Sequence, residues 1–197
     1  MSIIIFMIFL YIKTKYILVF LIPISYLILN ILYSILLKHK PIVDVVVIVI
    51  GFLLRIMYGG IIINVAVSKW LYLMIIFGSF YLGFGKRRNE IIKNGKDSRK
   101  VLQYYTKDFL DKNMYVCLTL AIVSYTLWCV DSDTILRVGN DFIYWTIPLL
   151  MVIFQLYSLN IEGNSHGDPI DVLFNDKYLI ILIISFVTIL TLLMYII

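Results

Sequence analysis

The chain has 197 residues, of which 62% are hydrophobic and only 15% are charged, and its mean hydropathy is +0.97. This composition excludes a water-soluble globular protein and favours a polytopic helical membrane protein, because the apolar residues form blocks long enough to span a hydrocarbon layer of about 30 Å. The net charge of +5 does not indicate nucleic-acid binding, since most lysines and arginines lie between the apolar blocks, where membrane topology and anionic head groups account for them.

The apolar blocks predict the helices in chain order. A short apolar stub, residues 1–12, precedes the longer segments, which cover about 16–37, 42–66, 70–85, 114–130, 142–159 and 178–197. The longest polar stretch, 86–113, lies between the third and fourth of these segments. We predict a single all-α transmembrane domain, residues 1–197, with five full spans, an N-terminal half-span and an amphipathic cytoplasmic loop helix.

The distribution of basic residues predicts the orientation of this bundle. Loops on one side carry twelve lysines and arginines, whereas loops on the other side carry four. The basic side comprises residues 38–44, 86–113 and 159–177. Because cytoplasmic loops hold the excess of Lys and Arg, we assign these loops to the cytoplasm.

Lys38 and Asp44 flank the link between the first two long segments. At the membrane surface Lys38 could hold a phosphate, and Asp44 could bind a metal or orient a base. Both residues also suit an ordinary helix junction, because a lysine is favourable at a helix C-terminus and an aspartate in the first helical turn. Both interpretations stay open at this point.

Arg55 lies within the apolar segment 42–66. An intramembrane arginine is costly unless it is paired or faces water, so it is a functional candidate. Gly51 and Gly59 lie four residues before and after it on the same helical face, where small residues let another helix or a ligand approach. A structural or snorkelling arginine is the alternative, and a channel or transporter could use the same residue.

Three adjacent cations, Lys86, Arg87 and Arg88, end the third apolar segment, and Glu90 follows them. Such cations could grip a diphosphate, since arginine offers a bidentate fork and lysine a compact charge. Positive-inside topology is the alternative explanation.

A helix cap at Asp97 or Ser98 is expected to start an amphipathic helix at the membrane interface. The apolar side of that helix would hold Val101, Leu102, Tyr105 and Phe109, and the helix could cover a cytoplasmic cavity or rest on lipid.

The segment 163–171 contains Asp168 and Asp171, and Asp176 follows. Three carboxylates could bind magnesium, but Asp168 as a cap, Pro169 at the first helical position and Asp171 in the first turn also make an ordinary helix start.

Five blocks occur in order along the chain: Tyr33-Ser-x-x-Leu-x-Lys38-His-x-Pro-x-x-Asp44, Gly51-Phe-x-Leu-Arg55 with Gly59-Gly60, Gly85-Lys-Arg-Arg88-x-Glu90, Arg99-x-x-Leu102-x-x-Tyr105 and Gly167-Asp168-Pro169. Together they resemble the decaprenyl-phosphate phosphoribosyltransferase branch of the UbiA superfamily of intramembrane prenyltransferases. The resemblance begins at about Tyr16 and implies that the chain corresponds to the C-terminal two thirds of a family member. It also implies the plasma membrane of a bacterium or archaeon.

The resemblance implies transfer of 5-phosphoribose from phosphoribosyl diphosphate to a polyprenyl phosphate in the lipid bilayer, with loss of diphosphate and use of magnesium. Tyr33, Lys38 and Arg55 would line a lipid-open phosphate site. The remaining substrate-binding candidates are the donor grips Lys86, Arg87 and Arg88, the carboxylates Asp44 and Glu90 that would orient sugar hydroxyls or hold the arginines, and Arg99, Tyr105 and Asp168.

One family block is not found in this chain: an Asn-Asp-x-x-Asp-x-x-x-Asp segment that resembles the main magnesium site and lies among further N-terminal spans. The family resemblance therefore implies an incomplete transferase, with a second polypeptide as a possible source of those spans. The alternatives are an inactive membrane protein that binds lipid phosphate or a partner bundle, and prenyl transfer to another acceptor.

Overall fold

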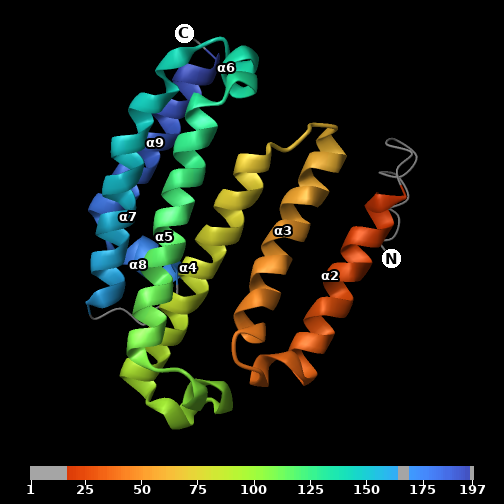
Figure 1. Ribbon diagram of the computed structural model, residues 1–197, viewed down its shortest axis with the longest axis vertical. Coiled ribbons are helices and arrows are strands. Elements are labelled where there is room, and N and C mark those ends of the chain that lie inside the picture. The colour runs from red at the N-terminus through yellow and green to blue at the C-terminus, as the bar shows by residue number, and fades with distance from the viewer. Residues whose placement is uncertain (1–16, 164–168, 196–197) are drawn as a thin grey trace.

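The computed structural model describes residues 17–163 and 169–195, and within these ranges it consists of helices and connecting loops (Figure 1). The long helices are α2 (Leu18–Ile35), α3 (Val43–Ile63), α4 (Lys69–Asn94), α5 (Lys107–Val130), α7 (Ile147–Glu162) and α9 (Lys177–Tyr195). The short elements are α6 (Ser132–Val138), α8 (Pro169–Asn175) and the 3-10 helices η1 (Leu37–His39), η2 (Lys96–Ser98), η3 (Lys100–Tyr104) and η4 (Asp141–Thr146). The apolar stub at 1–12 lies outside the described residues.

Five helical segments in the described part are long and apolar enough to cross a membrane, which confirms the expected all-α polytopic fold. They are α2, α3, α5, the continuous segment 141–162 that joins η4 to α7, and α9. Helix α4 is a sixth long helix, formed by the apolar segment 70–85 and a charged continuation to Asn94. All the apolar segments that follow the stub therefore become helices.

The polar stretch expected at 86–113 is mostly helical. Helix α4 continues to a C-cap at Gly95, whose φ of 75° is costly for residues with a Cβ. Helix α5 begins after Thr106, whose side-chain oxygen accepts a hydrogen bond of 3.2 Å from the backbone N–H of Phe109. The connection between the two helices is therefore much shorter than the polar stretch, because both helices extend beyond their apolar segments.

The amphipathic loop helix expected after Asp97 is replaced by η2 and η3. Val101 and Leu102 have no exposed surface, and Tyr105 is 2% exposed, so their side chains face the protein interior and not a lipid surface. These apolar side chains therefore pack against the protein, and of the two expected positions the one on lipid does not apply to them.

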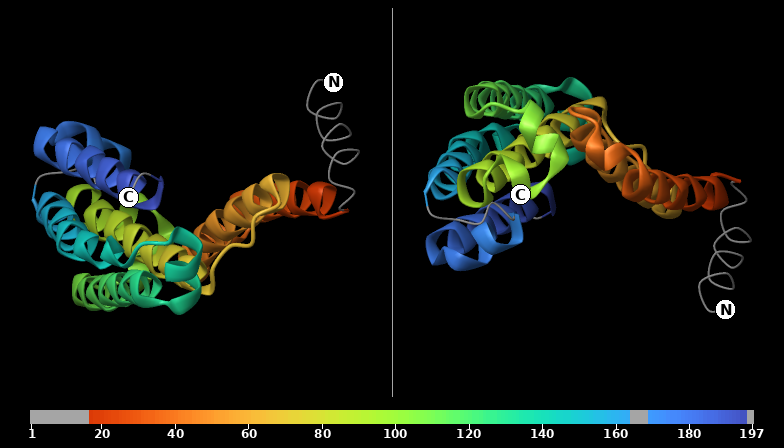
Figure 2. Two further views of the ribbon diagram at one scale, coloured as in Figure 1. Left: turned by 90° about the horizontal axis from the view of Figure 1, so that it is seen from above. Right: turned by 90° about the horizontal axis from the view of Figure 1, so that it is seen from below.

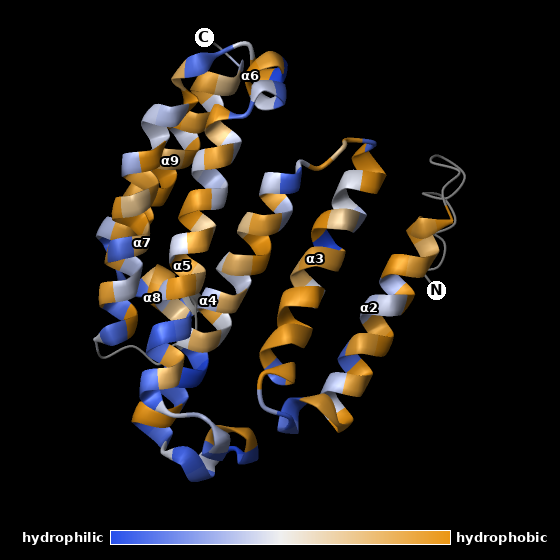
Figure 3. Ribbon diagram, viewed as in Figure 1, coloured by the Kyte–Doolittle hydropathy of each residue, from blue (hydrophilic) through white to orange (hydrophobic). Residues whose placement is uncertain are grey.

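Helices α4, α5, α7 and α9 form a bundle, while α3 packs against α4 and α2 packs against α3 (Figures 1 and 2). The pair α2–α3 extends away from the bundle as a single layer in both views of Figure 2. Polar residues gather where α4 ends, where α5 begins and in the loop between them (Figure 3). This end of the molecule also holds the turn between α2 and α3.

The contact between α3 and α4 is close. A Cβ atom at Gly83 would lie 2.6 Å from Cγ1 of the fully buried Val45. The missing side chain thus lets α4 approach α3 one turn from Arg87, the residue at the centre of the polar end.

Candidate functional site

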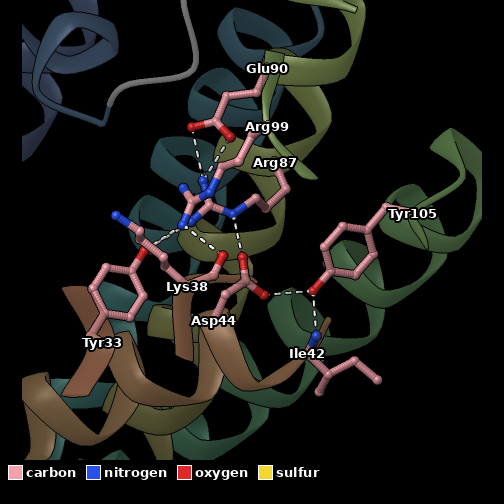
Figure 4. A network of polar contacts seen from close by, with 8 residues as sticks. All are labelled: Tyr33, Lys38, Ile42, Asp44, Arg87, Glu90, Arg99 and Tyr105. Carbon is pink, nitrogen blue, oxygen red and sulfur yellow. Dashed lines mark hydrogen bonds and ion pairs between the residues drawn. The ribbon is translucent and has the colours of Figure 1, made fainter. Parts of the chain in front are cut away.

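Arg87 is the centre of a polar network between α3 and α4 (Figure 4). Its Nε donates to Oδ2 of Asp44 at 2.6 Å, and its Nη1 donates to the two carboxylate oxygens of Glu90 at 2.8 and 2.7 Å. Asp44 stands in the first turn of α3, and Glu90 follows Arg87 by one helical turn. One guanidinium is therefore shared by two carboxylates from two helices.

The Asp44–Arg87 pair is removed from solvent, since Asp44 is 0% exposed and Arg87 is 2% exposed. Burial by itself lowers the pKa of Arg87, but the charges and the hydrogen bonds of Glu90 and Asp44 together raise it by more, so the pKa lies above its usual value. A buried charge is tolerated when it is paired and hydrogen-bonded. The pair therefore links α3 to α4 inside the protein.

Tyr105 connects this network to the turn before α3. Its hydroxyl donates to Oδ1 of Asp44 at 2.7 Å and accepts the backbone N–H of Ile42 at 2.5 Å. Ile42 has a φ of 66°, a region that is strained for a β-branched residue, so this hydrogen bond helps to hold the turn. Burial raises the pKa of Tyr105 well above its usual range, with the charge of Asp44 acting in the same direction.

Tyr33 and Arg99 form the outer part of the network. Nη2 of Arg99 donates to the Tyr33 hydroxyl at 2.9 Å and to the backbone carbonyl of Lys38 at 3.2 Å. Nη2 of Arg87 also lies 3.4 Å from the Tyr33 hydroxyl. Two guanidinium groups thus approach the same phenolic oxygen, which comes from α2.

Arg88 belongs to a different contact from Arg87, although the two residues are adjacent. Nε of Arg88 forms an ion pair with Asp111 of α5, and Nη1 donates to the side-chain oxygen of Asn89 at 3.1 Å. Asn89 in turn donates to the backbone carbonyl of Ile161 in α7 at 2.9 Å. Arg88 and Asn89 therefore join α4 to the bundle, away from the α2–α3 side.

Arg55 lies apart from the network, in a cavity between α2 and α3. The cavity has a volume of about 240 Å³ and is lined by both helices, including Tyr26, Tyr33, Gly51 and Arg55. Nη2 of Arg55 donates to the Tyr26 hydroxyl, and its guanidinium carbon lies 5.2 Å from the centre of the Tyr26 ring. Arg55 is exposed, so its remaining N–H donors are accessible from outside the α2–α3 pair.

The structure unites six of the predicted site residues, namely Tyr33, Asp44, Arg87, Glu90, Arg99 and Tyr105. Lys38 adjoins them through its backbone carbonyl, and Lys86 is half-buried on the same helix as Arg87. Arg55 and Arg88 lie elsewhere, and Asp168 falls outside the described residues.

The residues that the sequence reasoning missed are Tyr26, Ile42 and Asp111. The sequence pattern could have indicated Tyr26, because Tyr26, Asn30 and Tyr33 repeat at helical spacing as a polar stripe in an apolar helix. Nothing in the sequence marks Ile42, whose role follows from its backbone conformation.

The described residues do not fit a magnesium site as they stand. In this part of the chain no group of three or more His, Cys, Asp or Glu residues could hold a metal ion. Both oxygens of Glu90 and one oxygen of Asp44 accept hydrogen bonds from Arg87, and the other oxygen of Asp44 accepts the Tyr105 hydroxyl, so these carboxylates already have partners. The described residues therefore offer no magnesium site, and the use of magnesium stays a prediction.

These features define an integral membrane protein with a charged network at one end of its helices, next to a cavity that contains an intramembrane arginine. No family model matches the chain. The chain is 31% identical over 163 residues to a protein named decaprenyl-phosphate phosphoribosyltransferase from Corynebacterium glutamicum, which is 81% of this chain and 49% of that protein.

Two further relatives carry the same name. The protein from Mycobacterium tuberculosis is 29% identical over 170 residues, 85% of this chain and 55% of the relative. The protein from Mycolicibacterium smegmatis is 28% identical over 172 residues, 82% of this chain and 54% of the relative. The chain spans about half the length of these curated relatives, and it is homologous to them, which confirms the resemblance found in the sequence blocks.

Proposed function

We propose that the chain is a UbiA-type membrane transferase, and that it acts in the transfer of 5-phosphoribose from phosphoribosyl diphosphate to a polyprenyl phosphate. One observation carries this proposal: residues from separate blocks of the sequence meet in one network, and Tyr33 of that network also lines the cavity of Arg55. The names of the homologues support the same reaction class.

In this proposal a lipid phosphate lies in the α2–α3 cavity, whose two helices carry many exposed apolar side chains that lipid would cover. Arg55 supplies the positive charge, since a guanidinium binds phosphate through paired donors. A phosphate oxygen of the lipid attacks C1 of the ribose, the bond from C1 to the diphosphate oxygen breaks, and the diphosphate leaves with the electron pair. Cations at the polar end stabilise the negative charge on the leaving group.

The test is a transfer assay on the purified chain in lipid nanodiscs, with radiolabelled phosphoribosyl diphosphate and a polyprenyl phosphate. Arg55→Ala and Arg87→Ala should each reduce transfer at least about tenfold, since each removes charge-assisted hydrogen bonds. Lys96→Gln, a change at an exposed loop lysine, is the matched control and should leave transfer unchanged. Unchanged transfer in both arginine variants would contradict the assigned roles.

The same assay addresses magnesium and partners. Transfer that stops with a chelator and returns with magnesium would support the metal requirement. Transfer by the chain alone would contradict the need for a second polypeptide, whereas transfer that appears only with a co-expressed partner would support it. Transfer of a prenyl group in place of phosphoribose would support the related reaction with another acceptor.

Binding of lipid phosphate without turnover is the second candidate, and the Arg55 cavity favours it, because binding needs only this cavity. A chain that retains labelled polyprenyl phosphate in an Arg55-dependent way but transfers nothing would support it.

We also propose that the polar end faces the cytoplasm of a bacterial or archaeal cell. An Asp97→Cys variant, with Cys117 and Cys129 replaced by alanine, should react with a membrane-impermeant maleimide in inside-out vesicles only. Reaction in right-side-out vesicles would reverse the orientation.

A further inference from the structure

The charges of the network are not evenly compensated. Arg87 is paired with Asp44 and Glu90, and Arg88 is paired with Asp111. Arg99, in contrast, makes no ion pair with any carboxylate in the described part of the chain, and its hydrogen-bond acceptors there are the neutral Tyr33 hydroxyl and a backbone carbonyl. A guanidinium stays protonated at every physiological pH. Arg99 therefore carries a positive charge that no carboxylate of the described residues pairs with directly, at the outer edge of the network.

The geometry around Tyr33 makes this charge available. Arg99 uses only Nη2 for its contacts, so the donors at Nε and Nη1 have no acceptor among the described residues. Arg99 is half-buried, so it is partly desolvated and still within reach of a solute. Because Arg87 approaches the same phenolic oxygen, an anion near Tyr33 would also reduce the repulsion between the two guanidinium groups.

Arg99 also connects two segments. Arg99 precedes η3 and contacts the α2 side of the turn through Tyr33 and Lys38, whereas Tyr105 follows η3 and contacts the α3 side through Ile42 and Asp44. The η3 segment is thus attached at both ends to the α2–α3 turn. An anion that binds Arg99 would hold the first attachment in place.

We propose that Arg99 binds a phosphate or diphosphate group at the outer edge of the network, beside Tyr33. The bound anion then holds the η3 segment against the α2–α3 turn. The identification of the anion with the diphosphate of the sugar donor rests on the proposed function. Arg87 and Arg88 are then positioning residues, because their charges are already taken by carboxylates. This assignment differs from the sequence-based expectation that the Lys86–Arg88 cluster grips the diphosphate.

The test uses inorganic pyrophosphate as the probe and the full chain in phosphatidylcholine nanodiscs, with binding measured by calorimetry at constant ionic strength. Arg99→Gln should weaken binding by about tenfold or more, since it removes a charge-assisted hydrogen bond to the anion. Lys100→Gln removes the same charge from the next, exposed residue and should change the affinity by less than about threefold, as for a screened surface charge. Arg99→Lys keeps the charge without the fork and should fall between the two.

A second measurement needs no variant. In the unmodified chain, pyrophosphate should protect Arg99 from the arginine reagent phenylglyoxal, while Arg137, which is exposed at the opposite end of the molecule, should react at the same rate with and without pyrophosphate. This readout remains valid if Arg99→Gln fails to fold.

Three results would overturn the inference: no pyrophosphate binding, equal losses of affinity in Arg99→Gln and Lys100→Gln, or unprotected Arg99. Arg99-dependent binding in a chain without transfer activity would refute the proposed reaction and leave the anion site standing. Full transfer activity with Arg99 unprotected would refute the anion site and leave the reaction standing.

Discussion

The buried pair of Asp44 and Arg87 gives the sharpest test of how the network is held together. Asp44→Asn keeps the shape of the side chain and removes its charge. Removal of one partner of a buried pair costs about 3–5 kcal/mol. We expect the lower end, about 3 kcal/mol, because Arg87 keeps both hydrogen bonds to Glu90 and the new amide oxygen can still accept the hydroxyl of Tyr105.

The measurement is the free energy of unfolding in detergent micelles, followed by the loss of helical circular dichroism. Asp97→Asn, at an exposed loop aspartate, is the matched control and should change stability by less than about 0.5 kcal/mol. A cycle with Arg87→Met isolates the pair, since the double variant no longer leaves one charge buried alone. The double variant should be more stable than the sum of the single losses predicts, by about 2 kcal/mol. Additive losses within about 0.5 kcal/mol would refute direct coupling.

Two further predictions concern helix packing and pH. Gly83→Ala places a Cβ 2.6 Å from Cγ1 of the buried Val45 and should lower the free energy of unfolding by about 1–3 kcal/mol. Gly78→Ala, with open space around its Cβ, is the control and should be neutral or stabilising. Equal effects of the two variants would contradict the close contact. The pKa of Asp176 is lowered, chiefly by the side chain of Asn160, so its contribution to stability is complete above the unfolded pKa and is lost as pH falls through the lower folded pKa. Asn160→Ala should move the NMR titration of the Asp176 carboxylate to higher pH, and an unchanged titration would contradict this cause.

The helices could be predicted because the length of an apolar block is fixed by the membrane. Their ends could not, since α4 and α5 continue through charged residues in water, where helix propensity and caps decide and hydropathy does not. Two residues in the sequence do indicate those ends: Gly95 is a helix-ending glycine after α4, and Thr106 is a capping threonine before α5.

The residue types of the site could be predicted, but not their partners. Lys86, Arg87 and Arg88 look alike in the sequence as three cations at a helix exit. Successive residues on a helix point about 100° apart, so Arg87 faces α3 and Arg88 faces α5. Which cation meets which carboxylate depends on the rotation of α4 in the bundle, and that rotation is set by tertiary packing.

Tyr33 gives the two halves of the site a physical connection. Tyr33 lines the cavity that contains Arg55, and its hydroxyl accepts hydrogen bonds from Arg99 and Arg87. Tyr33 belongs to α2, which packs mainly on α3 and whose residues are mostly exposed. A lipid phosphate in the cavity and an anion at Arg99 would therefore act on the same side chain, and a shift of α2 would change both binding sites together.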